Sequence, residues 1–413
     1  MAAIIPFRAV RPQKRYVKKV ASCPYDILTS DEARKTARKN KKSFLHVIKS
    51  EIDLPEDINA YDDIVYETSR KNLFNFLKEG TMFQEGKECF YIYQQKMGNH
   101  VQNGIVACID TSDYIAGYIK RHELTRTDKE ADRTKHIDVL NAQTGPVFLT
   151  HRAVDAVDRI VGRIVEEKPE YNFIADDGIA HTVWKVDDDT IISDLQGTFL
   201  KRGSLYIADG HHRAASAVSV ARMRRRENPN HNGNEEYNRM MAVIFPDNQL
   251  KIMDYNRLVR DLNGMTEEEF LKGISENFVV SPGYKKKAPE KIHEFGMYLD
   301  KKWYRLCAKE GSYDEGDVVG ALDVSILQDN VLTPILGIGD VRTDERIAFV
   351  GGILGMKKLE EMVDSGEFTV AFSLYPTTMD QLMIVSNAGK IMPPKSTWFE
   401  PKLRSGLFVH LLD

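Results

Sequence analysis

A glycine turn joins an apolar run to a helix of small residues in SLYIADGHHRAASAVSVARM, residues 204–223. The apolar run ahead of Asp209 predicts a buried strand, and the alanine-rich stretch after Arg213 predicts a helix that packs closely on a sheet. Gly210 suits the junction, because glycine adopts backbone angles that other residues rarely adopt. A strand that turns directly into a helix favours α/β layers over an all-helical or an all-β fold.

Strands and helices alternate along the rest of the chain. ECFYIYQQKM (88–97) and GIVACID (104–110) predict paired strands, and MMAVIFP (240–246) with LKIMDY (250–255) predicts a second hairpin. RAVDAVDRIVGRIVEEKP (152–169) carries its apolar residues on one helical face and predicts a helix that ends at its proline. The expected fold class is therefore α/β with mixed sheets.

The pattern changes near residues 112 and 255. Past residue 255, short helical segments are interleaved with strand candidates such as KWYRLCAK (302–309). These changes predict three parts, which are an N-terminal region (1–112), a central domain (113–255) and a C-terminal lobe (256–413).

The composition excludes several classes of partner. The 413-residue chain is 42% hydrophobic and 29% charged, and its net charge of −4 argues against a nucleic-acid or membrane-surface binder. No apolar run approaches the roughly 18 residues of a membrane span. The four cysteines lie far apart, without metal-binding spacing, which predicts free thiols in a reducing compartment. We expect a cytoplasmic protein with no nucleic-acid or membrane partner. These patterns do not indicate its oligomeric state.

The run Asp-Gly-His-His-Arg, residues 209–213, has the chemistry of a phosphate site. The first N–H groups of a helix lack intrahelical partners and favour an anion. Gly210 permits close backbone approach, Arg213 offers a planar fork of donors, and His211 and His212 add donors that titrate near neutral pH. Asp209 would repel a phosphate unless a divalent cation bridged them, which predicts Mg²⁺ at Asp209.

Two other interpretations of this run remain open. Asp209 is alternatively a helix cap, with His211 and His212 as ordinary surface groups. A zinc site is disfavoured, because adjacent histidines do not easily point at one metal and no third ligand stands nearby in the sequence.

ADGHHRAASA resembles the signature of the ParB/sulfiredoxin-like fold, in which a turn at a helix start binds nucleotide phosphates. The nearer resemblance is to the ParB-like free serine kinases, which carry the same Asp-Gly-His-His-Arg run. This resemblance implies a nucleotide lobe, Mg²⁺, and the transfer of a phosphoryl group from ADP or ATP to L-serine, which gives O-phosphoserine. The cleft between that lobe and the C-terminal lobe is then the expected active site.

Further segments extend the resemblance. KRHEL (120–124) is similar to the kinases' His-Glu pair, which implies that His122 and Glu123 are catalytic together with Asp209, and that Glu123 is the base. MPPKSTWFEPKLRSGLF (392–408) and DYNRLVRDL (254–262) resemble segments that hold the amino acid. They imply substrate contacts at the following residues: Tyr255, Asn256, Arg257, Lys395, Ser396 and Thr397. A bidentate pair with the serine carboxylate is the role expected of Arg257.

Nearly the whole chain also resembles the DUF1015 family, through SFLHVIKSEIDLP, HELTRTDKEADR, GPVFLTH, ADGHHR and MPPKSTWF. The two resemblances together imply a ParB/sulfiredoxin-like nucleotide lobe, a C-terminal α/β lobe and an N-terminal addition without a counterpart in the kinases. Two other functions stay open: a ParB-like module that binds a nucleotide as a switch, and a regulatory protein that binds without turnover.

Overall fold

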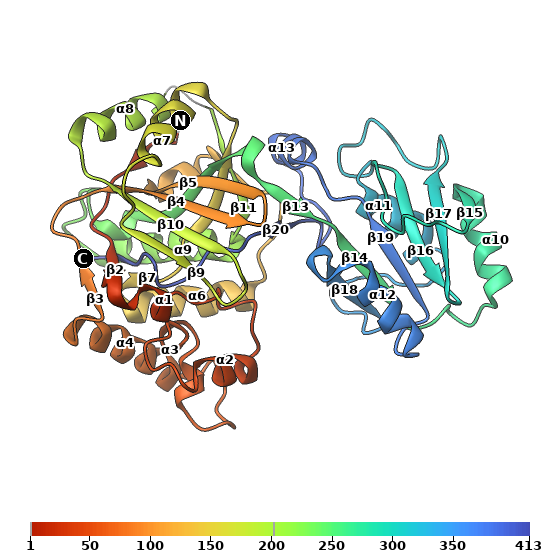
Figure 1. The fold of residues 1–413 in the computed structure, drawn as a ribbon, viewed down its shortest axis with the longest axis horizontal. Coiled ribbons are helices and arrows are strands. Elements are labelled where there is room, and N and C mark those ends of the chain that lie inside the picture. The colour runs from red at the N-terminus through yellow and green to blue at the C-terminus, as the bar shows by residue number, and fades with distance from the viewer. Residues whose placement is uncertain (1, 201–202) are drawn as a thin grey trace. The chain divides into compact units, whose positions relative to one another are not determined.

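The computed structural model describes residues 2–200 and 203–413, which form two compact units (Figure 1). The first unit comprises residues 1–250 together with 401–413, and the second comprises residues 251–400. Both units combine helices with sheets, so the predicted α/β class is confirmed. None of the helices in the described residues is both long and apolar enough to cross a bilayer.

The first unit is built on a nine-stranded sheet of order β6-β11-β8-β12-β5-β4-β10-β9, to which β1 adds beside β5. Its strands are β1 (Ile4–Ile5), β4 (Phe90–Met97), β5 (His100–Asp110), β6 (Ile119–Lys120), β8 (Val147–His151), β9 (Tyr171–Ile174), β10 (Ala180–Val186), β11 (Leu205–Asp209) and β12 (Arg239–Pro246). The sheet is mixed, because β11 pairs antiparallel with β8 but parallel with β6. The predicted pairing of β4 with β5 is confirmed.

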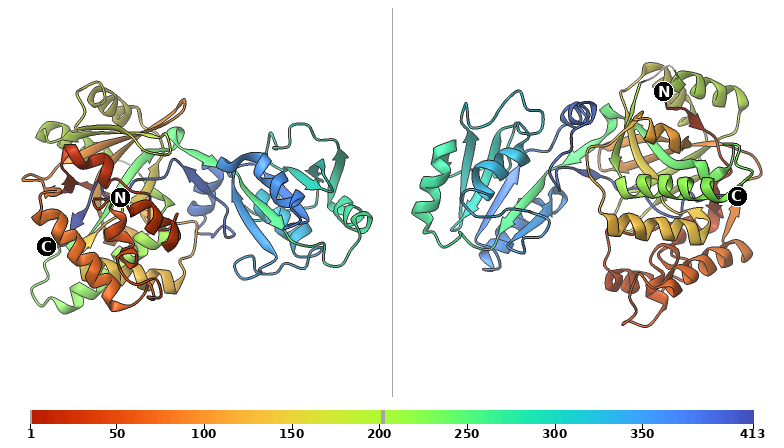
Figure 2. Two further views of the ribbon diagram at one scale, coloured as in Figure 1. Left: turned by 60° about the horizontal axis from the view of Figure 1, so that its bottom comes forward. Right: turned by 180° about the vertical axis from the view of Figure 1, so that it is seen from behind.

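Helices and short strand pairs complete this unit. They are α1 (Val17–Val20), α2 (Ser30–Ala37), α3 (Leu45–Ile48), α4 (Asp63–Lys78), α5 (Thr111–Ile115), α6 (Thr127–Leu140), α7 (Asp155–Ile164), α8 (Asp189–Leu200) and α9 (His211–Glu227), with β2 (Val10–Pro12) beside β3 (Met82–Gln84) and β7 (Ala142–Gln143) beside β21 (His410–Leu411). Helix α9 packs on β8 and β12, α6 packs on α9, and α4 packs on α6 (Figure 2).

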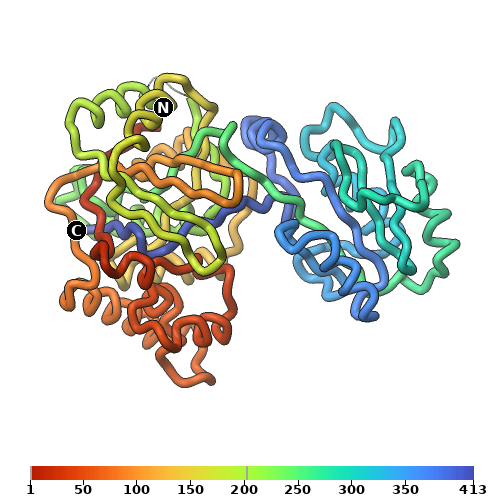
Figure 3. Tube along the Cα trace, viewed as in Figure 1, coloured from red at the N-terminus to blue at the C-terminus, as the bar shows by residue number. Residues whose placement is uncertain are grey.

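The N-terminal 112 residues are part of this unit and not a separate region as predicted. Strands β1, β4 and β5 lie in its main sheet. Helices α2, α3 and α4 share a hydrophobic core with Leu140 and Val409, which come from much later in the chain. Figure 3 traces the final segment, in blue, back into the first unit, where Val10 and Val409 exchange backbone hydrogen bonds of 2.8 and 2.9 Å.

The second unit contains a six-stranded antiparallel sheet and a separate strand pair. The sheet order is β15 (Phe278–Pro282), β17 (Lys302–Ala308), β16 (Glu294–Leu299), β19 (Val370–Leu374), β14 (Tyr255–Val259) and β18 (Ile347–Gly351), and the pair is β13 (Lys251–Met253) with β20 (Trp398–Glu400). Its α-helices are α10 (Glu267–Asn277), α11 (Asp323–Leu327), α12 (Gly355–Asp364) and α13 (Met379–Asn387).

The predicted hairpin of residues 240–246 with 250–255 is wrong. Strand β12 lies between β5 and β8, so both of its edges are already paired. Strand β13 pairs instead with β20, near the other end of the sequence. Two adjacent apolar runs do not show which of them has a free edge, because that depends on partners far away in the chain.

Candidate functional site

The junction of β11 with α9 begins at a shift in strand register. The pairing of β11 with β8 slips between Ile207 and Asp209, and such a bulge redirects the side chains beside it. Gly210 follows with φ of 91°, and α9 starts at His211. A Cβ at Gly210 would lie 2.9 Å from Nε of Arg213. The backbone angle therefore favours glycine, and a larger residue would also force the Arg213 side chain to shift.

Two cations hold the Asp209 carboxylate. Its Oδ2 accepts a 3.0 Å hydrogen bond from Nζ of Lys402, and Nη2 of Arg213 lies 3.8 Å from its Oδ1. The Gly210 N–H also donates to Oδ1, at 2.7 Å. Burial raises the pKa of Asp209, but Lys402 and Arg213 outweigh it and hold that pKa below its ordinary value. The carboxylate is therefore ionised and already paired.

Asp209 fits a Mg²⁺ ion poorly in this arrangement. Both of its oxygens accept hydrogen bonds within the protein, and the two neighbouring cations would repel another cation. Mg²⁺ demands near-ideal octahedral oxygen coordination, which an already shared carboxylate does not readily join. The role that these contacts support for Asp209 is to position Lys402 and Arg213.

Arg213 lines a small pocket of about 30 Å³ beside the junction. Its side chain is 11% exposed and donates to the carbonyl oxygen of Pro146. Its Nε makes no hydrogen bond within residues 2–200 and 203–413. Tyr25 and Ser405 are among the other lining residues, so the pocket draws on both ends of the chain.

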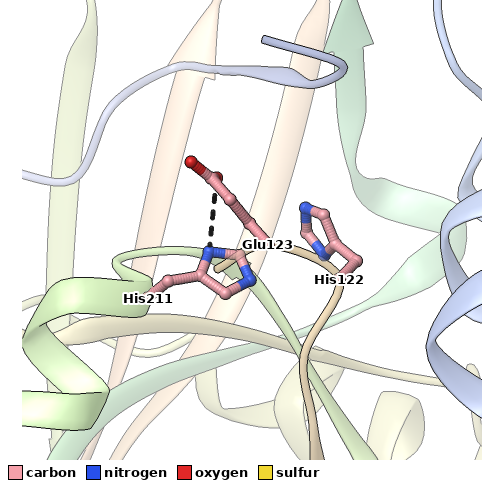
Figure 4. A group of neighbouring side chains, drawn as sticks. All are labelled: His122, Glu123 and His211. Carbon is pink, nitrogen blue, oxygen red and sulfur yellow. Dashed lines mark ion pairs between the residues drawn. The ribbon is translucent and has the colours of Figure 1, made fainter. Parts of the chain in front are cut away.

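His122, Glu123 and His211 come together at the start of α9 (Figure 4). Nδ1 of His211 lies 3.7 Å from Oε2 of Glu123, and the ring centroids of His122 and His211 are 4.5 Å apart in an edge-to-face contact. The two histidines are buried, whereas the Glu123 side chain is 48% exposed. The structure therefore brings His122 and Glu123, expected from the resemblance to be catalytic, next to the Asp-Gly-His-His-Arg run.

Burial sets the protonation state of both imidazoles. It lowers the pKa of His122 to about 4, and it lowers the pKa of His211 well below the ordinary value with a further contribution from His122. Both rings are consequently neutral near neutral pH. The expectation that His211 offers a charge that responds near neutral pH does not hold in this environment.

His212 points to a different neighbour. Its Nε2 accepts a 3.0 Å hydrogen bond from the N–H of Arg126, just before α6. Ser216, one helical turn further along α9, donates to the carbonyl oxygen of Glu130. The two adjacent histidines thus have separate surroundings, and His212 helps to join α9 to α6.

The predicted substrate residues lie in the second unit. Arg257 is 3% exposed, and its guanidinium donates to the carbonyl oxygens of Tyr255 and of Lys395, the latter at 2.9 Å. Within the described residues its guanidinium contacts backbone carbonyls and aromatic rings but no carboxylate, and burial lowers its pKa to about 10. Nζ of Lys395 lies 5.7 Å from the centre of the Tyr255 ring.

The remaining predicted substrate residues have structural contacts. The Asn256 amide donates to Asp254 and accepts from the backbone N–H of Leu374, so it joins β14 to β19. Ser396 is buried and donates to the carbonyl oxygen of Pro393, and Thr397 directly precedes β20. Arg257 is therefore the member of this set with the clearest capacity for an anionic ligand.

Sequence analysis missed Lys402. The lysine lies within the stretch 392–408, whose substrate role was placed on residues 395–397. In the structure residues 401–413 belong to the first unit, and Lys402 meets Asp209 there. No local pattern indicates this contact, because 193 residues separate the partners.

Comparison with known proteins identifies the family. Residues 4–325 match the family described as "Protein of unknown function (DUF1015)". The chain belongs to this family. No curated protein matches the sequence significantly.

Solved structures resemble this DUF1015 protein distantly. A conserved hypothetical protein from Pyrococcus furiosus is 14% identical, with a TM-score of 0.35, over 74% of this chain and 95% of its own. A free serine kinase in complex with AMP is 14% identical, with a TM-score of 0.35, over 71% of this chain and 86% of its own. C-terminally truncated SbnI from Staphylococcus aureus is 10% identical, with a TM-score of 0.39, over 74% of this chain and 87% of its own. Likenesses of this size carry no argument about the chemistry of this chain.

Proposed function

We propose that this DUF1015 protein transfers a phosphoryl group from ADP or ATP to the hydroxyl of free L-serine. The observation that carries the proposal is the half-exposed Glu123 carboxylate beside His211, the first residue of α9. A carboxylate that accepts a proton and a helix start that accepts phosphate are the two parts that such a transfer requires.

The phosphate side of the reaction is assigned to the first turn of α9. The backbone N–H groups that follow Gly210 bind the phosphate oxygens, and the guanidinium of Arg213 and the ammonium of Lys402 offset their charge. Asp209 holds both cations in place. Mg²⁺ is proposed as the counter-ion that the nucleotide carries, and it neutralises phosphate charge.

The acceptor side is assigned to Glu123. Glu123 accepts the proton of the serine hydroxyl as that oxygen bonds to the terminal phosphorus, and the bond from this phosphorus to the remaining nucleotide breaks. The products are O-phosphoserine and AMP or ADP. Arg257, in the second unit, is proposed by itself as a carboxylate-binding group, because its buried guanidinium has no acidic partner among the described residues.

The test is incubation of the purified protein with L-serine, Mg²⁺ and either ADP or ATP, with O-phosphoserine measured by mass spectrometry. Glu123→Gln should lower the rate by about 100- to 10,000-fold, the usual contribution of a general base, while nucleotide affinity stays close to wild type. Glu166→Gln, an exposed glutamate after α7, is the matched control and should keep the wild-type rate. No product with either donor would remove the proposal.

Nucleotide binding without turnover is the second candidate. The cation pair on Asp209 and the start of α9 supply a phosphate site whether or not Glu123 acts as a base. A protein that senses a nucleotide, as a ParB-like module does, should bind ADP or ATP and form no product. In that case Glu123→Gln changes no measured property.

A further inference from the structure

The side chains of His122, Glu123 and His211 present three donor atoms to one point. One atom from each residue lies within 4.8 Å of the other two. Two ligands that each bond zinc at about 2.1 Å stand at most about 4.2 Å apart. Ligands of a tetrahedral site stand about 3.4 Å apart, so this set must close by up to about 1.4 Å around an ion, and Figure 4 shows the Glu123 carboxylate beside the His211 ring with His122 next to it.

The surroundings of the His122 and His211 imidazoles favour the binding of a metal ion over an ion pair. His122 is 1% exposed and hydrogen-bonds the backbone carbonyl of Ile207, the kind of contact that orients a ligating histidine. His211 is 5% exposed, and its buried Nε2 has no hydrogen-bond partner within the described chain. A buried imidazole nitrogen without a partner in the described chain, beside a second imidazole and a carboxylate, is suited to bind a metal ion.

The donor set selects a class of metal. Two imidazole nitrogens and one carboxylate oxygen suit zinc and other divalent transition metals, whereas Mg²⁺ and Ca²⁺ prefer oxygen ligands throughout. The Glu123 carboxylate supplies the negative charge, and its half-exposed side chain can move toward an ion.

We infer that His122, Glu123 and His211 bind one divalent transition-metal ion, and that this binding requires neither a nucleotide nor serine. The inference goes beyond the proposed kinase activity and does not depend on it. Because Glu123 is also the proposed base, an ion held here would compete with proton transfer. Metal binding and phosphoryl transfer are therefore measured separately.

The experiment is a titration of the full-length, chelator-stripped protein with Co²⁺, followed by visible absorption and then by displacement with Zn²⁺. One equivalent should bind, with bands that indicate nitrogen and oxygen ligands, and Mg²⁺ should not displace it. His122→Ala and His211→Ala should each weaken binding by at least about 100-fold, because loss of an outer-sphere contact alone costs 10- to 100-fold.

The neighbour of His211 provides the matched control. His212→Ala removes an imidazole from the next position, whose Nε2 is already used by Arg126, and should leave Co²⁺ affinity within about 3-fold of wild type. Circular dichroism and thermal melts verify that each variant is folded. Equal affinities for His211→Ala and His212→Ala, or no Co²⁺ binding by the folded wild type at millimolar concentration, would overturn the inference. Binding that survives in the double variant of His122 and His211 would show adventitious surface sites only.

Discussion

Each of the two compact units buries groups whose pKa values are shifted by burial, imidazoles in the first unit and a carboxyl group in the second. The first unit buries six imidazoles, each at most 5% exposed, which are His122, His136, His151, His181, His211 and His410. The second unit buries the carboxyl group of Asp323, which is 6% exposed and whose Oδ2 has no hydrogen-bond partner in the described residues. Both units also bury other acidic and basic side chains, such as Glu51 in the first and Arg257 in the second, so the contrast concerns the buried imidazoles and the carboxyl of Asp323.

Burial is the main cause of the pKa shifts in both units. It lowers the pKa of His122 to about 4 and the pKa values of His136 and His181 to about 3. It raises the pKa of Asp323 to about 7, against a backbone hydrogen bond from His293 that lowers it. Removal from water disfavours the charged form of any group, so an imidazole and a carboxyl shift in opposite directions. The same physical effect therefore gives the two units opposite responses to pH.

The largest predicted effect is that acid weakens the first unit and strengthens the second. Between pH 6.5 and about 4, the unfolded first unit binds more protons than the folded one, so its stability falls as pH falls. Between about pH 4 and about pH 7, the folded second unit binds more protons through Asp323, so its stability rises as pH falls. Each group contributes about 1.4 kcal/mol per unit of pKa shift. Urea unfolding at about pH 5 and about pH 7.5 gives the free energy of unfolding of each unit, when pulsed hydrogen exchange read by mass spectrometry follows the two units separately.

Urea midpoints that move in the same direction in both units would break the comparison. Trp184 lies in the first unit, and Trp303 and Trp398 lie in the second. Variants that keep only Trp184 or only Trp303 give an independent fluorescence signal for each unit. The mass-spectrometric and fluorescence midpoints should agree for each unit.

Replacing the buried carboxyl isolates the second unit's share of this response. Asp323→Asn should stabilise the second unit above pH 7 by up to about 4 kcal/mol, because the variant has no buried carboxyl to ionise. Near pH 4 the two proteins should be equally stable, since Asp323 is then neutral. The Asn side chain retains an oxygen for the N–H of His293. Asp314→Asn, at an exposed position of the same unit, is the control and should change stability little at either pH.

Two glycines with similar backbone angles test how tightly each unit is built around them. Gly210 in the first unit and Gly264 in the second have φ of 91° and 79°. A Cβ at Gly210 meets Nε of Arg213 at 2.9 Å, whereas a Cβ at Gly264 has nothing within 4 Å. Gly210→Ala should cost about 2 to 4 kcal/mol from strain and overlap together, and Gly264→Ala about 1 to 2 kcal/mol from strain alone. Chemical denaturation measures both, and equal costs would show that Arg213 simply moves aside.

The smallest predicted effect is on ligand affinity, and it distinguishes Arg213, assigned to phosphate, from Arg257, assigned to a carboxylate. Arg213→Ala should weaken ADP binding by about ten- to a hundred-fold, because a charge-assisted contact to phosphate is lost at a partly desolvated site. Arg222→Ala, at an exposed position of the same helix, should leave ADP affinity unchanged. Arg257→Met should leave ADP affinity close to wild type and weaken serine binding, since Arg257 is assigned to the carboxylate. Calorimetric titrations with ADP and with serine compare the wild type with these three variants. A loss of ADP affinity in Arg257→Met equal to that in Arg213→Ala would contradict the division of roles.

Local patterns were enough to predict part of the fold and one strand of the site. The apolar run, the glycine and the small residues of 204–223 predicted β11, the turn and α9, because each preference acts within a few residues. The pairing of β4 with β5 was predictable for the same reason. The hairpin predicted from β12 and β13 failed because strand pairing depends on which edges are free. That is decided by strands from distant parts of the chain.

At the Asp-Gly-His-His-Arg run, too, some features could be predicted from the sequence and others depend on the folded structure. The sequence by itself determined that Gly210 is needed and that Arg213 and a helix start meet at one point. Only the tertiary structure decided that Lys402 pairs with Asp209, and that His122 and Glu123 lie beside His211. It also decided that the imidazole of His211 is neutral. Burial and the approach of charges are properties of the packed chain, because both depend on residues that only folding brings within a few ångströms.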